Sequence, residues 1–358
     1  MPIKSTCFSH AELLTGEWVA SLGAFKGVTL LKRHDHYFDC DFNGSHTSFV
    51  VLPTDKSWCL TLVLSNCTYK FIHSALQFLE QASVRLLGIQ TLNFSPAAIV
   101  VYFESDLALN DNEWQKWLAF AQAEQADIGL RSFFKVQEKC RLACFDMDST
   151  LIQAEVIDEL AAEAGLLAEV SAITERAMQG ELNFQESFQH RLQMLKGLPE
   201  IAVQAVLDRI KLMDGAEQLF AFLDKQSMYT VILSGGFDVF ARYVQQRLGI
   251  HEVHANTLEF VNGQLSGRVV APIMDAERKQ ATLVDLAHQQ SVPMAQTLAV
   301  GDGANDLLML GQAGLGIAFR AKPKVQASAR IVIRFGTLAW APFFLGYSQT
   351  ELEALSLN

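Results

Sequence analysis

The sequence predicts an α/β protein with a doubly wound, Rossmann-like parallel sheet, a helical insert in that core, and an additional N-terminal α+β domain. Strand-like and helix-like runs alternate over the second half of the 358-residue chain, and this alternation is typical of parallel sheets covered by helices. Acidic and glycine-rich segments directly follow several strand-like runs. In open α/β sheets, ligands bind at this carboxyl edge of the strands.

Half of the residues are hydrophobic and the chain is long, so more than one sizeable core can form. We expect an N-terminal domain at residues 1–135, the α/β core at residues 136–345, and a tail at residues 346–358. The segment after Phe335 is aromatic and apolar. We expect that segment to pack on the core or on a partner chain.

The N-terminal region contains three strand-like and two helix-like runs. The strand-like runs are Ser48–Leu52, Cys59–Leu64 and Ala98–Phe103, and the helix-like runs are Phe71–Leu79 and Asn112–Gln122. From the second strand to about residue 134, the order suggests a β-α-β-β-α-β unit.

The core alternates between strands and helices. Strands are expected at Leu142–Phe145, Tyr229–Leu233, Thr297–Val300 and Gly314–Phe319. Helices are expected at Gly215–Lys225 and Asp238–Leu248 and from Asp275–Lys279 onward. Asn262-Gly263 predicts a hairpin turn between Leu258–Val261 and Leu265–Val270. The insert, residues 153–212, predicts four short helices because glycines fall where helices should stop, at Gly165, Gly180 and Gly197.

Composition limits the classes of partner and the compartment. The net charge of −11 argues against general nucleic-acid binding. The sequence has neither a signal-peptide pattern nor an apolar run of the ~18 residues that span a bilayer, so we expect a cytoplasmic protein that does not bind membranes. Six cysteines lack metal-ligand spacing and are expected to be free thiols, at Cys7, Cys40, Cys59, Cys67, Cys140 and Cys144.

The strongest chemical signal is the pair Asp146 and Asp148, which directly follows the strand expected at Leu142–Phe145. One carboxylate can attack phosphorus and form an aspartyl phosphate, while the other exchanges protons with the leaving and entering oxygens. The alternative is a solvated or helix-capping pair of acids.

Three further segments follow in strand, loop, helix order. Val231–Gly236 predicts a strand that ends in a turn, where the Ser234 hydroxyl and free backbone N–H groups suit a phosphate oxygen. Lys279 lies near the start of a helix, and Gly301–Asp306 follows a strand. Each segment alone is an ordinary turn, surface lysine or loop, but their order and spacing together favour one site.

The motifs D-M-D-S-T, S-G-G, Lys279 and G-D-G-A-N-D resemble the haloacid dehalogenase-like phosphotransferase superfamily. Within it, Gln153–Leu160, Ala177–Phe184 and His190–Leu198 are most similar to the phosphoserine phosphatases. The resemblance covers about residues 139–319 and is weak or absent before residue 139. It implies Mg²⁺-dependent hydrolysis of O-phospho-L-serine through a phosphoaspartate, the last step of serine biosynthesis.

The resemblance also implies roles for the acidic residues. Asp146 would be the nucleophile, and Asp148 would protonate the leaving serine oxygen and then deprotonate water. Mg²⁺ would be bound by the Asp146 side chain, the Asp148 backbone carbonyl and the Asp302 side chain, with Asp306 behind them. Lys279 would add a further positive charge against the phosphate. Because ion-pumping members with D-K-T-G-T lack an acid at the second position, Asp148 favours a hydrolase.

The remaining site residues would bind the substrate. Ser234, the Gly235 amide and Asn305 would complete the phosphate site as neutral donors. Glu155 could pair with an ammonium group and Arg191 could bind a carboxylate through two hydrogen bonds, which together describe an α-amino acid.

The residues of the insert also have ordinary structural interpretations. Arg191 fits an exposed helix face, and Glu155 fits a first-turn acid favoured by the helix dipole. Met178 and Phe184 could form an apolar wall of the cap or could be core residues.

The N-terminal β-α-β-β-α-β order is similar to ACT-type ligand-sensing modules, which implies an amino-acid effector. The alternative is a structural extension or one that forms a homodimer. Three functional alternatives also stay open: a phosphotransferase that moves the phosphoryl group to another alcohol, a broader small-molecule phosphatase, and a serine-responsive regulator with an idle catalytic domain.

Overall fold

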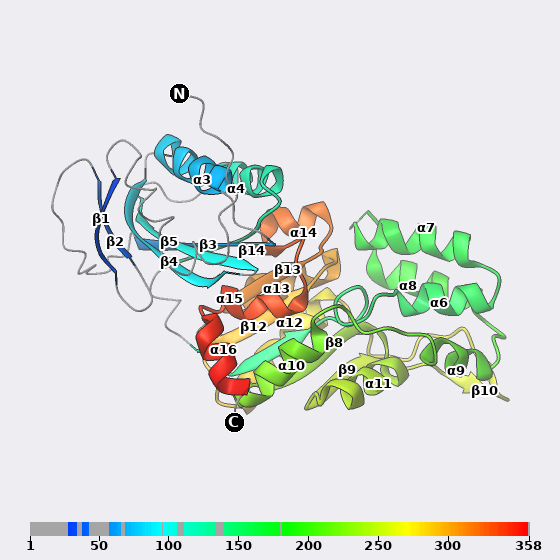
Figure 1. The fold of residues 1–358 in the computed structure, drawn as a ribbon. Helices are drawn as coiled ribbons and strands as arrows, with labels where there is room; N and C mark the ends of the chain where they lie inside the picture. The colour runs from blue at the N-terminus through cyan, green and yellow to red at the C-terminus, as the bar shows by residue number, and fades with distance from the viewer. Residues whose placement is uncertain are drawn as a thin grey trace. The chain divides into compact units, whose positions relative to one another are not determined.

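The computed structural model describes residues 28–33, 38–42, 57–65, 69–82, 84–94, 96–105, 111–132, 139–179 and 181–356. The chain forms two compact units, Lys139–Ala339 and a second unit of Met1–Glu138 with Trp340–Asn358 (Figure 1). The expected core, 136–345, is longer than this unit at both ends, and the expected domain limits stay a prediction. The difference at its end arises because α15 (Ala341–Phe344) contacts the N-terminal strand β3 (Ser57–Leu64).

The α/β unit is built on a parallel sheet, as the alternation predicts. Its strand order is β14 (Ile331–Ile333), β13 (Leu315–Phe319), β12 (Thr297–Gly301), β7 (Leu142–Phe145), β8 (Tyr229–Phe237) and β9 (Glu252–Asn256). Every neighbouring pair in this order is parallel. The first strand along the chain, β7, lies between β8 and β12, so the order reverses there. Such a reversal is where doubly wound sheets bind ligands.

The buried strands are continuous apolar runs. Every residue of β7 and β12 is buried, which is the pattern of strands covered on both faces. The connecting helices are α10 (Ala216–Lys225), α11 (Asp238–Leu248), α12 (Ala276–Gln289), α13 (Leu307–Gln312) and α14 (Pro323–Ser328). Short 3-10 helices lie at Met294–Gln296, Ala304–Asp306 and Leu338–Trp340.

The insert forms four helices, as expected: α6 (Val156–Glu163), α7 (Leu167–Met178), α8 (Phe184–Met194) and α9 (Ile201–Leu207). Figure 1 shows α6, α7 and α8 gathered in a group beside the sheet. The helices end near the glycines, and α8 begins where the Asn183 side chain accepts a hydrogen bond of 3.1 Å from the Glu186 amide. Gly180 lies outside the described residues.

Two expectations for the α/β unit are wrong in detail. The segment Ser234–Gly236 is not a turn after β8 but part of that strand, whose pairing with β9 shifts register between Leu233 and Phe237. The hairpin at Asn262-Gly263 forms with positive φ at both residues, but its strands are short, β10 (Phe260–Val261) and β11 (Gln264–Leu265). The residues after Leu265, up to Val270, form no strand.

The N-terminal unit contains an antiparallel sheet in the order β1 (Val28–Arg33), β2 (Phe38–Phe42), β4 (Arg85–Phe94), β5 (Ala97–Glu104), β3 and β6 (Asp127–Ser132). With α3 (Tyr69–Gln81) and α4 (Asp111–Ala123), the order from β3 to β6 is β-α-β-β-α-β, as expected. The resemblance to ACT-type modules stays a prediction. The strand expected at Ser48–Leu52 lies outside the described residues.

Aromatic contacts join α3, α4 and β5 of this unit. The Phe78 and Trp117 rings meet edge to face, with centroids 4.9 Å apart, and Trp117 stacks on Phe103 of β5. In the C-terminal segment, Phe343 and Phe344 of α15 are buried, and α16 (Gln349–Ser356) follows. None of the helices in the described ranges is both long and apolar enough to span a membrane.

Candidate active site

Asp146 and Asp148 lie in the loop that follows β7, at the point where the strand order reverses. The Asp146 amide still donates to the Val300 carbonyl of β12, at 2.9 Å, which fixes the start of the loop. The chain then turns sharply, because the amides of Thr150, Leu151 and Ile152 all point to the Met147 carbonyl. This turn buries both carboxylates.

Lys279 is fully buried and joins two of the acidic residues. It lies in the first turns of α12, whose N-terminus is capped by the Asp275 side chain. Its Nζ is 2.7 Å from Asp146 Oδ1 and 2.7 Å from Asp306 Oδ1. Burial alone would lower the pKa of Lys279, but the charges of Asp146 and Asp306 outweigh burial and raise it. Lys279 is therefore a permanent positive charge beneath Asp146.

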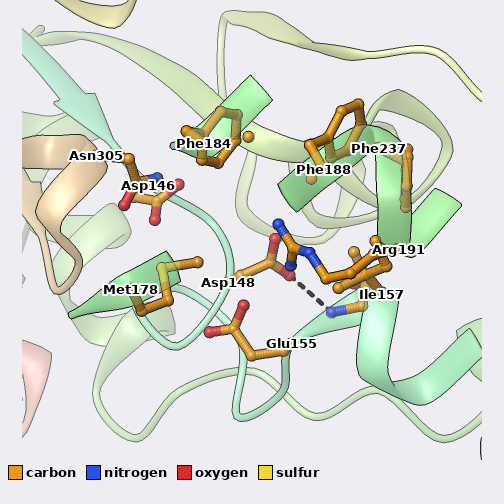
Figure 2. A pocket seen from close by; sticks show the side chains of 13 residues that line it. Asp146, Asp148, Glu155, Ile157, Met178, Phe184, Phe188, Arg191, Phe237 and Asn305 are labelled. Carbon is orange, nitrogen blue, oxygen red and sulfur yellow. Dashed lines mark hydrogen bonds between the residues drawn. The ribbon is translucent and has the colours of Figure 1, made fainter. Parts of the chain in front are cut away.

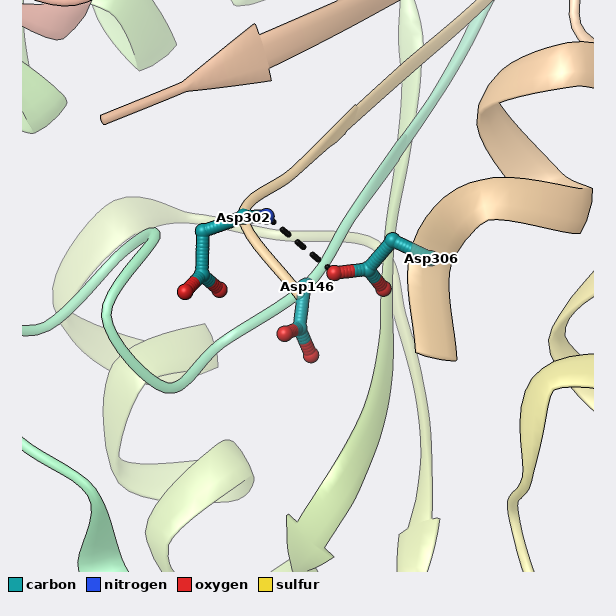
Figure 3. Close-up of side chains that lie close together, drawn as sticks. All are labelled: Asp146, Asp302 and Asp306. Carbon is teal, nitrogen blue, oxygen red and sulfur yellow. Dashed lines mark hydrogen bonds between the residues drawn. The ribbon is translucent and has the colours of Figure 1, made fainter. Parts of the chain in front are cut away.

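Asp146, Asp302 and Asp306 form a cluster whose carboxylate oxygens lie within 4.8 Å of one another (Figure 3). Both Asp306 oxygens are already used: Oδ1 by Lys279, and Oδ2 by the amides of Asp302 and Gly303 at 3.1 and 3.0 Å. Asp306 therefore holds Lys279 and the loop that carries Asp302. Asp146 Oδ1 accepts from Lys279, and Asp302 Oδ1 accepts from the Thr150 hydroxyl at 3.4 Å.

Like charges in this cluster oppose one another. Burial, and then the Asp306 charge, raise the pKa of Asp146 to about 6, although Lys279 acts in the opposite direction. Burial and the charges of Glu155 and Asp146 raise the pKa of Asp302 well above its ordinary value. A set of buried donors made only of carboxylate oxygens, with excess negative charge, fits a hard divalent cation.

A small pocket, lined in part by Asp146, lies next to this cluster. Eight of the residues predicted from the sequence line it: Asp146, Asp148, Glu155, Met178, Phe184, Arg191, Gly235 and Asn305. Figure 2 shows Asp148, Glu155 and Arg191 pointing toward one another, with Phe184 and Phe188 on another side. The pocket thus joins the loop after β7 to the helices of the insert.

The other four predicted residues lie beneath or behind the pocket. Lys279, Asp302 and Asp306 belong to the buried cluster described above. Ser234 is fully buried, and its Oγ accepts a hydrogen bond of 2.9 Å from the Gly236 amide. A hydroxyl that accepts one hydrogen bond keeps its own proton to donate.

Asp148 is held by backbone groups on two sides. Its Oδ1 accepts a hydrogen bond of 3.0 Å from the Val156 amide, drawn as a dashed line in Figure 2. A Cβ added at Gly236 would lie 2.4 Å from Asp148 Oδ2, so only glycine permits this approach. Burial, and then the charges of Glu155 and Asp146, raise the pKa of Asp148 well above its ordinary value. Asp148 is therefore biased toward its protonated form.

Glu155 and Arg191 form an oppositely charged pair at the insert side of the pocket. Ser149, at a positive φ of 55°, donates to Glu155 Oε1 at 2.6 Å. Burial raises the pKa of Glu155 to about 7, and the bond from Ser149 opposes that shift. Arg191 is only 2% exposed, so its interpretation as a helix-surface charge is wrong.

Met178 and Phe184 cover the glycines of the core. A Cβ added at Gly303 would lie 2.8 Å from Met178 Sδ, and one at Gly235 would lie 2.9 Å from Phe184 Cζ. Both side chains therefore pack against the loops that surround the carboxylates, in agreement with an apolar wall.

Several residues of the site were missed by the sequence analysis. Gly236 is part of the S-G-G motif, and its closeness to Asp148 could have been inferred from that motif. Ser149 lies within the D-M-D-S-T motif, and that motif could have indicated its place in the site. Phe188 and Phe237 line the pocket but carry no signal that distinguishes them from core residues.

The chain is similar to known hydrolases. Residues 140–314 match the family model of the haloacid dehalogenase-like hydrolases. A phosphoserine phosphatase of Mycobacterium tuberculosis is 44% identical over 234 residues, which make up 65% of this chain and only 57% of that protein's length. A probable phosphoserine phosphatase of Schizosaccharomyces pombe is 42% identical over 237 residues, 66% of this chain and 80% of that protein.

Two solved structures are also similar. A probable phosphoserine phosphatase from Vibrio cholerae, in its unliganded form, has a TM-score of 0.63 at 33% identity and covers 85% of this chain and 89% of its own. A phospho-aspartyl intermediate analogue of phosphoserine phosphatase has a TM-score of 0.54 at 40% identity and covers 55% of this chain and 94% of its own.

Proposed function

Since the chain belongs to the haloacid dehalogenase-like hydrolases, and within them to the phosphoserine phosphatases, we propose that it hydrolyses O-phospho-L-serine to L-serine and phosphate, the last step of serine biosynthesis. The observation that carries this proposal is that residues suited to a phosphate and residues suited to an amino acid line one pocket. Asp146 and Asp148 face the same space as the oppositely charged pair Glu155 and Arg191. The first pair suits a phosphate ester and the second suits the ammonium and carboxylate of an α-amino acid.

In the first step, an Asp146 oxygen attacks phosphorus, an aspartyl O–P bond forms, and the bond from phosphorus to the serine oxygen breaks. Asp148 gives its proton to that serine oxygen. In the second step, water attacks the same phosphorus, Asp148 takes the proton of the water, and the aspartyl O–P bond breaks to release phosphate. The raised pKa of Asp148 supports its first role, because a general acid must be protonated before it acts.

Phosphate binding would draw on residues from α12, β8 and the 3-10 helix Ala304–Asp306. Lys279 lies 2.7 Å from Asp146 Oδ1 and brings positive charge to the attacking group. Ser234, the Gly235 amide and Asn305 would donate to the phosphate oxygens. Asn305 would donate through its Nδ2 group; its Oδ1 atom is an acceptor and is buried without a hydrogen-bond partner in the part of the chain that the structure describes.

Asp146 and Asp302 would hold Mg²⁺, together with the Asp148 backbone carbonyl. When bound, Mg²⁺ supplies positive charge that offsets repulsion between the carboxylates and the phosphate dianion. Asp306 would act indirectly, because both of its oxygens are engaged by Lys279 and backbone amides.

Removal of the metal should make stability depend on pH. The folded-state pKa of Asp146 is raised to about 6 and that of Glu155 to about 7, so the fold favours their protonated forms. Stability should therefore be highest below their unfolded values, near 4, and fall as pH rises through about 6 to 7. We expect the melting temperature in EDTA to be lower at about pH 8 than at about pH 5. Mg²⁺ should raise it more at the higher pH, whereas an equal effect at both would argue against this site.

Asp148→Asn tests the two proton transfers separately. We expect turnover of O-phospho-L-serine to fall by about 10²- to 10⁴-fold, the usual contribution of a general acid or base. An aryl phosphate has a leaving group that needs no proton, so its first step should survive. The variant should then release about one equivalent of phenolate per enzyme and stall as a phosphoaspartate. Steady release without such a burst would remove the proposed role in water activation.

Arg191→Ala tests the substrate assignment. We expect KM for O-phospho-L-serine to rise by about 10- to 100-fold, because a hydrogen bond to a charged group contributes about 1.5–3 kcal/mol. Turnover of a simple aryl phosphate should be unchanged. Equal losses on both substrates would show that Arg191 supports the fold and does not recognise the carboxylate, and would favour a broader small-molecule phosphatase.

A further inference from the structure

The Arg191 guanidinium donates to a side chain of α7, and that side chain in turn donates to one of α6. Arg191 comes from α8, and its Nη1 donates to Thr174 Oγ1 of α7 at 3.1 Å. The same Thr174 hydroxyl lies 2.6 Å from Asp158 Oδ1 of α6. Arg191 and Thr174 are 2% and 3% exposed. Three helices of the insert therefore meet through one chain of polar contacts.

The hydroxyl proton of Thr174 points toward Asp158. A threonine hydroxyl has a single proton to donate, and its two acceptors here are Asp158 Oδ1 at 2.6 Å and the Val170 carbonyl at 3.1 Å. The shorter bond to a carboxylate is the stronger one. Asp158 is itself oriented, because Ser171 Oγ donates to its other oxygen at 2.8 Å. A Thr174 lone pair is consequently directed at Arg191.

Most N–H groups of the Arg191 guanidinium have no hydrogen-bond partner among the described residues and can donate to a ligand. Nε donates to the Ser187 carbonyl at 3.2 Å and Nη1 donates once, to Thr174. Among the described residues, Nη2 has no hydrogen-bond partner, and Arg191 lines the pocket. A carboxylate in direct contact with Arg191 would engage the fork through two bonds. Thr174 orients the guanidinium through a single hydrogen bond to Nη1.

We propose that Thr174 and Asp158 are positioning residues that aim Arg191 at the carboxylate of the substrate. This inference rests on the proposed function, in which Arg191 binds the carboxylate of a phosphorylated α-amino acid. The two residues would therefore contribute to selection of that substrate and would have no part in the chemistry at phosphorus. Their effect should appear only for substrates that carry a carboxylate.

The test compares O-phospho-L-serine with O-phosphoethanolamine, which has the same phosphate and ammonium groups but lacks the carboxylate. For Thr174→Val we expect KM for O-phospho-L-serine to rise by about tenfold, in the range of one lost hydrogen bond, with kcat nearly unchanged. The kcat/KM for O-phosphoethanolamine should stay at the wild-type value. Thr174→Ser keeps the hydroxyl and should restore binding, and Asp158→Asn should resemble Thr174→Val.

A matched control is Thr297→Val, which removes another buried threonine hydroxyl. Thr297 Oγ1 donates to the Met294 carbonyl at 2.8 Å and accepts from the Gly314 amide at 3.1 Å, at the start of β12. It should lower the melting temperature without changing the ratio between the substrates. In an Arg191→Ala background, Thr174→Val should add nothing for O-phospho-L-serine, because the group that it positions is gone.

The possible failures are distinct. If Thr174→Val lowers kcat/KM equally for both substrates, or if Thr174→Ser behaves like Thr174→Val, the positioning role is overturned while the proposed function stands. If the wild-type enzyme turns over O-phosphoethanolamine as well as O-phospho-L-serine, the carboxylate is not recognised, and the proposed function is overturned together with this inference.

Discussion

Asp146→Asn should reduce phosphate release from O-phospho-L-serine by about 10⁴- to 10⁶-fold, the loss seen when a catalytic nucleophile is removed. The amide has nearly the same shape as the carboxylate but is a very weak nucleophile. It would also remove one of the two charges that contact Lys279. The fold should persist, because Asp306 still pairs with Lys279 at 2.7 Å and the neutral amide relieves repulsion within the carboxylate cluster.

Single-turnover assays and a mass spectrum of the quenched enzyme would check this result. The wild type, or more clearly Asp148→Asn, should carry one additional phosphoryl group at Asp146, and Asp146→Asn should carry none. Asp224→Asn, an exposed acid of α10, is the control and should retain full activity. A phosphoryl group on another residue, or an Asp146→Asn variant with near wild-type turnover, would rule out Asp146 as the nucleophile.

Lys279→Met should have the largest effect on stability. Lys279 is fully buried between Asp146 and Asp306, and its removal leaves buried carboxylates without their counter-charge. Breaking a buried ion pair on one side typically costs about 3–5 kcal/mol, which corresponds to a fall in melting temperature of about 2–4 °C per kcal/mol for a domain of this size. Hydrolysis should also be lost, because the phosphate loses a positive charge.

Thermal unfolding with and without Mg²⁺ separates the two effects. Mg²⁺ should recover part of the stability of Lys279→Met, since it also offsets the carboxylate charges, but activity should stay absent. Lys211→Met, an exposed lysine of the same unit, should change stability by less than about 0.5 kcal/mol. A Lys279→Met variant as stable as the wild type would mean that the cluster is protonated and needs no counter-charge.

Much of the α/β unit was predictable because the strands β7, β8 and β12 begin as continuous apolar runs and lead into acids or glycines. The limits of α11, the start of α12 and the four helices of the insert follow local signals of this kind. The course of β8 through Ser234–Gly236 was not predictable, since small residues normally indicate a turn and the register shift against β9 depends on tertiary pairing. The sequence analysis did not individually place β1, β2, β4, β6, β9 or β14.

The site residues that lie in motifs were predictable. The contacts between residues of separate elements were not. Asp146, Asp148, Lys279 and Asp302 lie in motifs whose order along the chain indicates one edge of a sheet. Their exact contacts do not follow from spacing: Lys279 reaches Asp306 as well as Asp146.

The contacts of Arg191 could not be predicted from the sequence either. Thr174 and Asp158 lie on different helices from Arg191, and no spacing rule connects residues 16 and 17 positions apart. The sequence alone therefore left Arg191 as either a surface charge or a ligand-binding residue. Its burial excludes the surface charge, and its part in ligand binding stays a prediction.

The most direct test of the central claim is phosphate release from O-phospho-L-serine, with and without Mg²⁺, compared with phosphothreonine and a plain aryl phosphate. We expect hydrolysis that needs the metal and strongly prefers phosphoserine, because Glu155 and Arg191 line the same pocket as Asp146. Equal turnover of all three would preserve the phosphatase chemistry but contradict the assignment of phosphoserine as the substrate.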